Sequence, residues 1–435
     1  MSAMAIGIWC SVGLLVLMII RVPIAIALLL AATTGIYLVQ GSFAAWFQIA
    51  GAPINSTNYG LSVIPLFVLM GNLAVHAGLS RDLFVMLARL IGRMRGGLAI
   101  ATILGCAGFS ALSGSSLATA ATMGRVTLGE MRKRGYSKGL ATGSVAAGGT
   151  IGILIPPSVM LAIYALMTEQ SIRQMFAAGL FPGLMLTGVF VVTVMIWVRL
   201  SPRATQDIAT KDLPMMDEKV SATGVLSLVG LVVIVLGGLY GGLFTPTEAA
   251  AVGSLGTFII AWARGGLTRE TLSDAMIDTA ATSAMIFLII FGSTLYGTFL
   301  SVTGIASAIR GFVGGLDASP FMILMVILFI YILLGFFMDS LGMLLLTLPV
   351  LFPVAVQIGI DPILFGILVV MAVELGLITP PLGMNVFVVR SIAPDVSLMQ
   401  IFAGTVPFVI SFLVAISIVL MFPDLATWLP QYLYR

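Results

Sequence analysis

The feature of this sequence that most constrains its fold is a series of apolar stretches that recurs from one end of the chain to the other. Each stretch has about 17 to 25 residues, enough for one α-helix to cross a hydrocarbon core roughly 30 Å thick. Only 9% of the residues are charged, whereas a soluble domain carries roughly 25%. We therefore predict an all-α polytopic membrane protein without a soluble domain of useful size.

The apolar stretches also place the membrane crossings. We predict ten, at residues 3–20, 23–39, 60–77, 139–168, 176–198, 221–243, 246–263, 280–300, 361–389 and 396–422. The first is interpreted as a retained helix, because it has neither a preceding basic segment nor a small-residue cleavage site. Segments 79–97 and 264–281 are amphipathic and are either interfacial helices or solvated loops with a helical tendency. Cys10 and Cys106 lie in apolar sequence, which indicates buried thiols rather than a disulfide framework or a metal site.

The distribution of basic residues predicts the orientation of the chain, because cytoplasmic loops retain positive charge. All but three of the 20 Lys and Arg residues fall on one side of the predicted crossings, the exceptions being Arg173, Arg310 and Arg435. Both termini then face the opposite, outer side, and the polar segment 201–220 is a cytoplasmic connector. The net charge of +3 agrees with this orientation signal and does not indicate nucleic-acid binding.

A run of small hydroxyl residues, Ser-Gly-Ser-Ser at 113–116, interrupts the apolar segment at about 97–128. The segment lies between two basic clusters assigned to the cytoplasmic side, so it must leave that side and return to it. Each arm of about 16 residues spans roughly 24 Å, slightly less than a full crossing. We therefore predict a re-entrant helical hairpin with these serines at its tip. Two complete helices joined on the outer side would give the same sidedness.

The predicted crossing 139–168 contains Pro156-Pro157 and is expected to break there, because proline removes a helical donor and clashes with the preceding turn. The break frees carbonyl groups before the prolines and presents the N-terminus of a second half-helix after them. Taken alone, this pattern is more typical of a simple proline kink in a membrane helix.

The second part of the chain, residues 221–435, repeats these features of the first part, residues 1–200. The motif LGLITPPLGMNVF matches IGILIPPSVMLAI, which lies 224 residues earlier. A second broken helix is therefore predicted at about 361–389, preceded by a second hairpin at about 319–357.

The second hairpin is predicted to enter from the outer face, because Arg310 is the only basic residue between Ser301 and Pro362. Its polar tip contains Gly335, Asp339, Ser340 and Gly342. The two parts then form inverted-topology repeats. Interrupted segments at matching places in such repeats indicate the binding site of a secondary transporter, near the bilayer midplane.

The motifs GFSALSGSS, GTIGILIPPS and ELGLITPPLGMN resemble those of the large membrane subunit of tripartite ATP-independent periplasmic (TRAP) transporters, over about residues 5–425. The resemblance implies an elevator-type secondary transporter in the bacterial inner membrane. It also implies sodium-driven uptake of an organic acid, such as a C4-dicarboxylate, a sialic acid or a related sugar acid, delivered by a periplasmic solute-binding protein. A small four-helix membrane subunit is expected as a further partner on a separate polypeptide, and no organic cofactor is expected.

The resemblance further implies two sodium sites, each at a hairpin tip and the neighbouring break. Carried onto this sequence, the ligands of the first site are the hydroxyl groups of Ser110 and Ser113 and the backbone carbonyls of Gly152, Ile155 and Pro157. The ligands of the second site are Gly335, Gly376, Thr379 and Leu382. Neutral oxygen atoms of this kind suit a hard cation.

Hydroxyl, amide and carboxyl side chains at the tips and breaks are the candidate substrate contacts. They are Ser115, Ser116, Ser158, Asp339 and Asn385, which lie beside half-helix N-termini able to hold a carboxylate or a polyol. Asp339 would repel an anion, so it binds a hydroxyl or amine of the substrate, pairs with a cation, or caps the tip facing water. Glu374 is either a coupling residue or the acceptor of a structural hydrogen bond.

Other functional classes were weighed against this one. A stand-alone sodium-coupled anion symporter or a sodium/proton antiporter with the same inverted repeats is the alternative, and it would transport without a binding protein. An enzyme is disfavoured, because the sequence has one histidine, no H-E-x-x-H motif and no G-x-x-x-x-G-K-[ST] motif. A passive channel is disfavoured, because two opposed hairpins suit alternating access better than an open pore.

Overall fold

The computed structural model confirms the predicted all-α architecture. The residues that it describes are 2–56, 58–201, 204–205 and 222–434. These residues are helical apart from short connections and one isolated β-bridge. The predicted connector, residues 201–220, falls almost entirely outside them.

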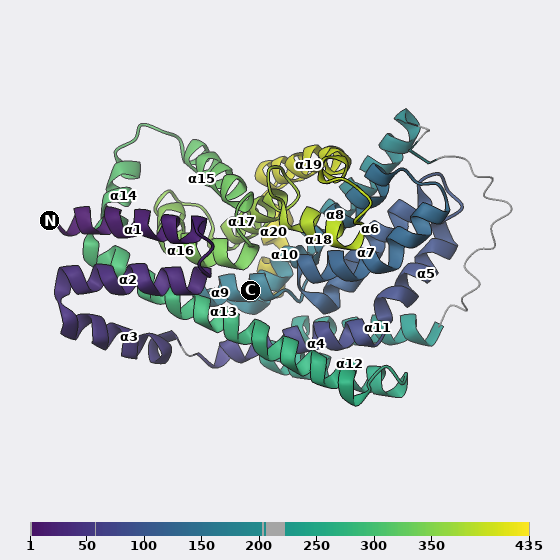
Figure 1. The fold of residues 1–435 in the computed structure, drawn as a ribbon, viewed down its shortest axis with the longest axis horizontal. Coiled ribbons are helices and arrows are strands. Elements are labelled where there is room, and N and C mark those ends of the chain that lie inside the picture. The colour runs from purple at the N-terminus through teal and green to yellow at the C-terminus, as the bar shows by residue number, and fades with distance from the viewer. Residues whose placement is uncertain (1, 57, 202–203, 206–221, 435) are drawn as a thin grey trace.

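A long helix, α13 (Arg269–Thr303), runs along one side of the molecule (Figure 1). It packs against the N-terminal helices α1 (Ala3–Ile19), α2 (Ile24–Gln40), α3 (Ser42–Ser56) and α4 (Val63–His76). A short 3-10 turn, η1 (Tyr59–Ser62), leads into α4, and α12 (Pro246–Ala263) packs between α4 and α11 (Ala222–Tyr240). We call this group of helices the frame.

The first hairpin and the first broken helix form as predicted. The helices of this region are α5 (Leu79–Ile91), α6 (Gly97–Ser113), α7 (Ser116–Lys133), α8 (Lys138–Leu154), α9 (Val159–Met167) and α10 (Ile172–Leu200). Gly114 ends α6 with a φ of 56°, a conformation that glycine adopts without a Cβ penalty. The hydroxyl group of Ser115 then caps α7 by accepting from the amide of Ala118. Beyond the second arm, α8 and α9 are bent by 41° at their break.

The second hairpin and broken helix repeat this arrangement. Their helices are α15 (Pro320–Gly335), α16 (Ser340–Gln357), α17 (Pro362–Gly376) and α18 (Met384–Ile392). At the tip, a carboxylate oxygen of Asp339 accepts from the amide of Gly342 at 3.0 Å and so caps α16. Asp339 thus has the capping role that Ser115 has in the first hairpin. The remaining helices are α14 (Ile305–Gly314), α19 (Leu398–Met421) and α20 (Asp424–Leu433).

Each predicted crossing coincides with a helix or with a pair of half-helices. Six helices of the described chain are long and apolar enough to cross a membrane alone, or seven spans if α8 and α9 count as one. Five of the six are predicted crossings, formed by η1 with α4 and by α10, α11, α13 and α19. The sixth is α16, the second arm of a hairpin whose first arm has 16 residues.

Two parts of the helix pattern differ from the predictions. The amphipathic segment 264–281 is not a separate interfacial element, because most of it forms the start of the continuous 35-residue helix α13. That helix contains no proline, so its acidic residues change the polarity of one end without ending the helix. In addition, α3, α14 and α20 were not predicted. Cys106 is buried as expected, Cys10 is half-buried, and both are free thiols.

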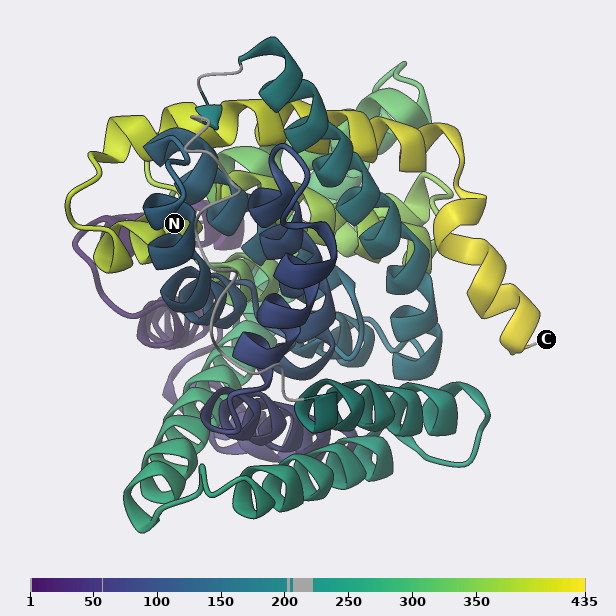
Figure 2. The ribbon, with the colours of Figure 1, turned by 90° about the vertical axis from the view of Figure 1, so that its right-hand side faces the viewer.

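Helix α19 lies at the edge of the molecule opposite α11 and α12 in both views (Figures 1 and 2). It packs directly on α8 through glycines. A Cβ atom on Gly143 would overlap the carbonyl oxygen of Gly404, and one on Gly404 would overlap that of Gly139. Small residues at such a crossing let helix backbones approach closely. The contact therefore fixes the helix that leads into the first break.

Candidate functional site

The tip of the first hairpin lies directly against the first break. A Cβ atom on Gly114 would lie 3.0 Å from the carbonyl oxygen of Pro157 and 3.4 Å from the amide nitrogen of Val159. On α8, a Cβ atom on Gly152 would lie 2.9 Å from the carbonyl oxygen of Ser115. Glycine at both positions therefore allows tip and break to meet backbone to backbone.

Hydroxyl groups gather beside this contact. Ser110 donates to the carbonyl oxygen of Ala107 at 2.5 Å, and the oxygens of Ser113 and Thr119 lie 2.6 Å apart in a hydrogen bond. The Thr119 oxygen would lie 2.8 Å from a Cβ atom on Gly152. Each hydroxyl oxygen retains acceptor capacity after donating its proton. Sequence reasoning missed Thr119, although its place one turn into α7 after the serine tip was a usable signal.

The other two predicted ligands of this site lie in the break itself. Ile155 has extended backbone at the end of α8, and the residues from Ile155 to Ser158 are buried. With the glycine and hydroxyl contacts above, the structure brings the predicted set of the first site into one region. This geometry fits a cation with neutral ligands, and the role of each oxygen stays a prediction.

The second tip and the second break also meet at glycines. A Cβ atom on Gly376 would lie 2.7 Å from the Cα atom of Gly335. The hydroxyl group of Thr379 donates to the carbonyl oxygen of Leu375 at 2.6 Å. The hydroxyl oxygen of Thr379 keeps its lone pairs, and these are available to bind a cation. Leu382 is 38% exposed. The second break is thus more open than the buried first break.

The candidate substrate residues fall into two groups. Ser116 and Ser158 are buried, and Ser158 caps α9 by accepting from the amide of Leu161. Asn385 is also buried, and its amide group donates to the carbonyl oxygen of Ala146 at 3.3 Å. The two that keep partial exposure are Ser115 and Asp339, one at each tip. These two are the residues that a solute could reach in this conformation, and all five assignments stay predictions.

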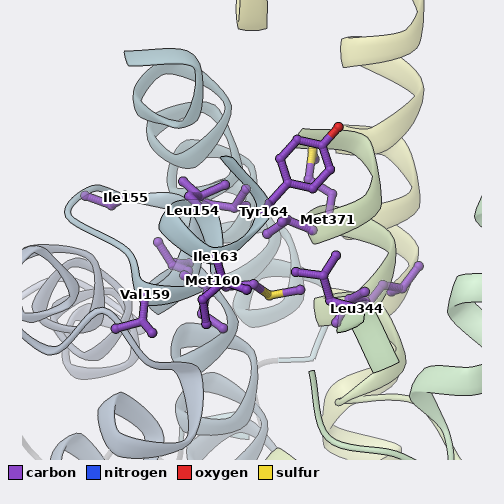
Figure 3. Packing of buried hydrophobic residues seen from close by; sticks show 14 of the residues in the cluster. Leu154, Ile155, Val159, Met160, Ile163, Tyr164, Leu344 and Met371 are labelled. Carbon is purple, nitrogen blue, oxygen red and sulfur yellow. The ribbon is translucent and has the colours of Figure 1, made fainter. Parts of the chain in front are cut away.

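The two repeats are joined by an apolar core. Figure 3 shows side chains of the first break and α9, among them Leu154, Ile163 and Tyr164, packed towards Leu344 of α16 and Met371 of α17. The hydroxyl group of Tyr164 donates to the carbonyl oxygen of Pro362 at 2.6 Å. The breaks and tips are therefore parts of one packed unit.

This arrangement defines a class of protein. A polytopic helical protein with two hairpins, each meeting a proline-broken helix at its tip, has the architecture of secondary transporters built from repeats. The family comparison is more specific: the family model described as "Tripartite ATP-independent periplasmic transporter, DctM component" matches residues 11–425. The chain belongs to this family and is a multi-pass protein of the bacterial inner membrane.

Characterised relatives agree with this assignment. The C4-dicarboxylate TRAP transporter large permease protein DctM of Pseudomonas aeruginosa is 35% identical over 87% of this chain and 88% of its own length. The sialic acid TRAP transporter large permease protein SiaM of Vibrio cholerae is 31% identical over 96% of this chain and 97% of its own length. The fold is similar to that of the Alcanivorax borkumensis YdaH transporter, with a TM-score of 0.66 and 15% sequence identity. The match covers 90% of this chain and 89% of that transporter's chain.

Proposed function

We propose that this chain forms the transport path for sodium-driven uptake of an organic acid. A periplasmic solute-binding protein delivers the acid, and a small four-helix membrane subunit is the second partner. The observation that carries the proposal is the paired contact of Gly114 with Pro157 and of Gly335 with Gly376. These contacts put the backbone of each break directly against the tip of one hairpin.

The chemistry of the oxygens supports sodium as the driving ion. The described residues contain no group of three or more His, Cys, Asp or Glu side chains suited to a metal ion. Apart from the Asp339 carboxylate, which caps α16, they offer hydroxyl and carbonyl oxygen at the tips, which suits a hard cation that needs little negative charge. When bound, sodium would supply positive charge beside the tips and so favour an anionic solute.

The solute class rests on the relatives. Their names specify C4-dicarboxylate, sialic acid, isethionate and ectoine. Each of these solutes carries a carboxylate or a sulfonate group. We propose that the acid group lies near Ser115 at the first tip, and that Asp339 at the second tip binds a hydroxyl or amine of the solute. We also propose that the hairpins and breaks move together past α13 in an elevator motion.

Replacing Ser113 tests the sodium site of the first hairpin. Ser113→Ala removes an oxygen ligand whose loss costs about 1 kcal/mol, by analogy with a hydrogen bond. We expect the sodium concentration for half-maximal uptake to rise roughly fivefold, measured in proteoliposomes at fixed solute concentration.

The control is Ser144→Ala, because Ser144 is a buried serine whose hydroxyl group donates to Leu140 within its own helix. It should leave the sodium dependence unchanged. An unchanged sodium dependence in Ser113→Ala as well would remove the Ser113 hydroxyl from the site.

A further inference from the structure

Glu374, in α17, is the one acidic or basic side chain among the described residues that is buried, with an exposed fraction of 0%. In the described chain, neither of its carboxylate oxygens has a partner at full hydrogen-bonding geometry. Buried polar atoms nearly always have a partner, and a buried charge needs a compensating charge. Within the described chain the ionised carboxyl group of Glu374 has no compensating charge, which leaves a place for a charged ligand.

Both hairpins bring a hydroxyl group to this carboxyl group. The polar groups that face it are the hydroxyls of Ser116 and Ser340. Ser116 begins α7 and Ser340 begins α16, so each is the first residue of the second arm of its hairpin. The two serines are 224 residues apart, the spacing of the repeats. They are thus equivalent positions that meet at one carboxyl group.

The carboxyl group itself occurs once. The position 224 residues before Glu374 is Thr150, whose hydroxyl group donates to the carbonyl oxygen of Ala147 within α8. The first repeat therefore has no acidic counterpart. A single carboxyl group lies between equivalent serines, and the hydroxyl oxygen of Ser116 is itself buried without a partner.

The charges around Glu374 determine whether a cation or an anion can bind there. No Lys, Arg or His side chain of the described chain forms an ion pair with Glu374. An anion would be repelled by the carboxylate. The ends of α7 and α16 are partly used already, because Ser115 and Asp339 cap them by accepting amide protons. Two carboxylate oxygens and two hydroxyl oxygens are hard ligands for a small cation.

We propose that Glu374, Ser116 and Ser340 form an additional sodium site between the two hairpin tips. The inference rests on the proposed sodium coupling. It is distinct from the two predicted sites, because its ligands include a carboxylate and come from both hairpins at once. The ion bridges the repeats, and its charge is balanced by Glu374.

The test is equilibrium binding of radioactive sodium to the purified full-length chain, with any subunit that co-purifies. The wild type should bind three sodium ions per chain and Glu374→Gln two, because glutamine preserves the shape of the side chain but removes its charge. Ser116→Ala should weaken the binding of one ion, which tests the same site if the glutamine variant does not fold.

Ser144→Ala is the matched control, since its hydroxyl group bonds within α8, and it should bind as the wild type does. Equal numbers of ions in the wild type and Glu374→Gln, with Ser113→Ala reducing binding in both, would overturn this site and leave the sodium coupling intact. Absence of sodium binding in the wild type would overturn both proposals.

Discussion

Gly376→Ala is expected to abolish most sodium-dependent uptake. The added Cβ atom would lie 2.7 Å from the Cα atom and 3.0 Å from the carbonyl carbon of Gly335. Both neighbours are backbone atoms, so no flexible side chain can move aside. The second tip must then separate from the second break. Overpacking of this kind costs about 1–3 kcal/mol. Because this strain opposes the contact between tip and break, uptake should fall roughly tenfold for each 1.4 kcal/mol.

The measurement is initial uptake in proteoliposomes, normalised to the amount of inserted protein. Gly237→Ala is the matched control, because a Cβ atom on this glycine of α11 meets nothing within 4 Å. It should transport as the wild type does. Wild-type uptake by Gly376→Ala would show that the tip and the break need not stay in contact.

The second large effect is expected for the stability of the protein. Gly143→Ala places a Cβ atom against the carbonyl oxygen of Gly404 and must push α19 away from α8. The expected loss is about 1–3 kcal/mol, seen as a melting temperature in detergent several degrees below that of the wild type. Helix α8 leads into the first break, so uptake should fall as well.

Gly129→Ala is the control for this prediction. Gly129 is an exposed position in α7, and a Cβ atom there meets nothing within 4 Å. Alanine is the better helix former, so this variant should be as stable as the wild type or slightly more stable. Equal melting temperatures for Gly143→Ala and Gly129→Ala would contradict the close packing of α8 and α19.

The elements that sequence reasoning found are those with strong local signals. Long apolar stretches predicted the crossings, and Pro156-Pro157 and Pro380-Pro381 predicted the breaks, because the effect of proline on a helix is local. Helix α3 was missed: it follows Gly41, which ends α2 with a φ of 89°, and it carries Phe43 and Trp46 on an exposed face. That segment is too short and too mixed in polarity to stand out as a crossing.

The site was predictable only in part, for a related reason. Serines at a tip and carbonyls at a break are visible in the sequence, and the structure brings them together. The meeting of Ser116 and Ser340 at Glu374 depends on how the two repeats pack, which no local pattern encodes. The burial of Ser158 and Asn385 is likewise a consequence of tertiary packing, so their polarity alone suggested more access than the structure gives.

The most direct test of the account is solute accumulation in proteoliposomes that contain this chain and the proposed small membrane subunit. The solute is the organic acid that the proposed periplasmic binding protein retains on purification. The account predicts that accumulation requires both an inward sodium gradient and the binding protein outside. Equal accumulation with potassium in place of sodium would contradict sodium coupling, and accumulation of free solute without the binding protein would identify a stand-alone symporter instead.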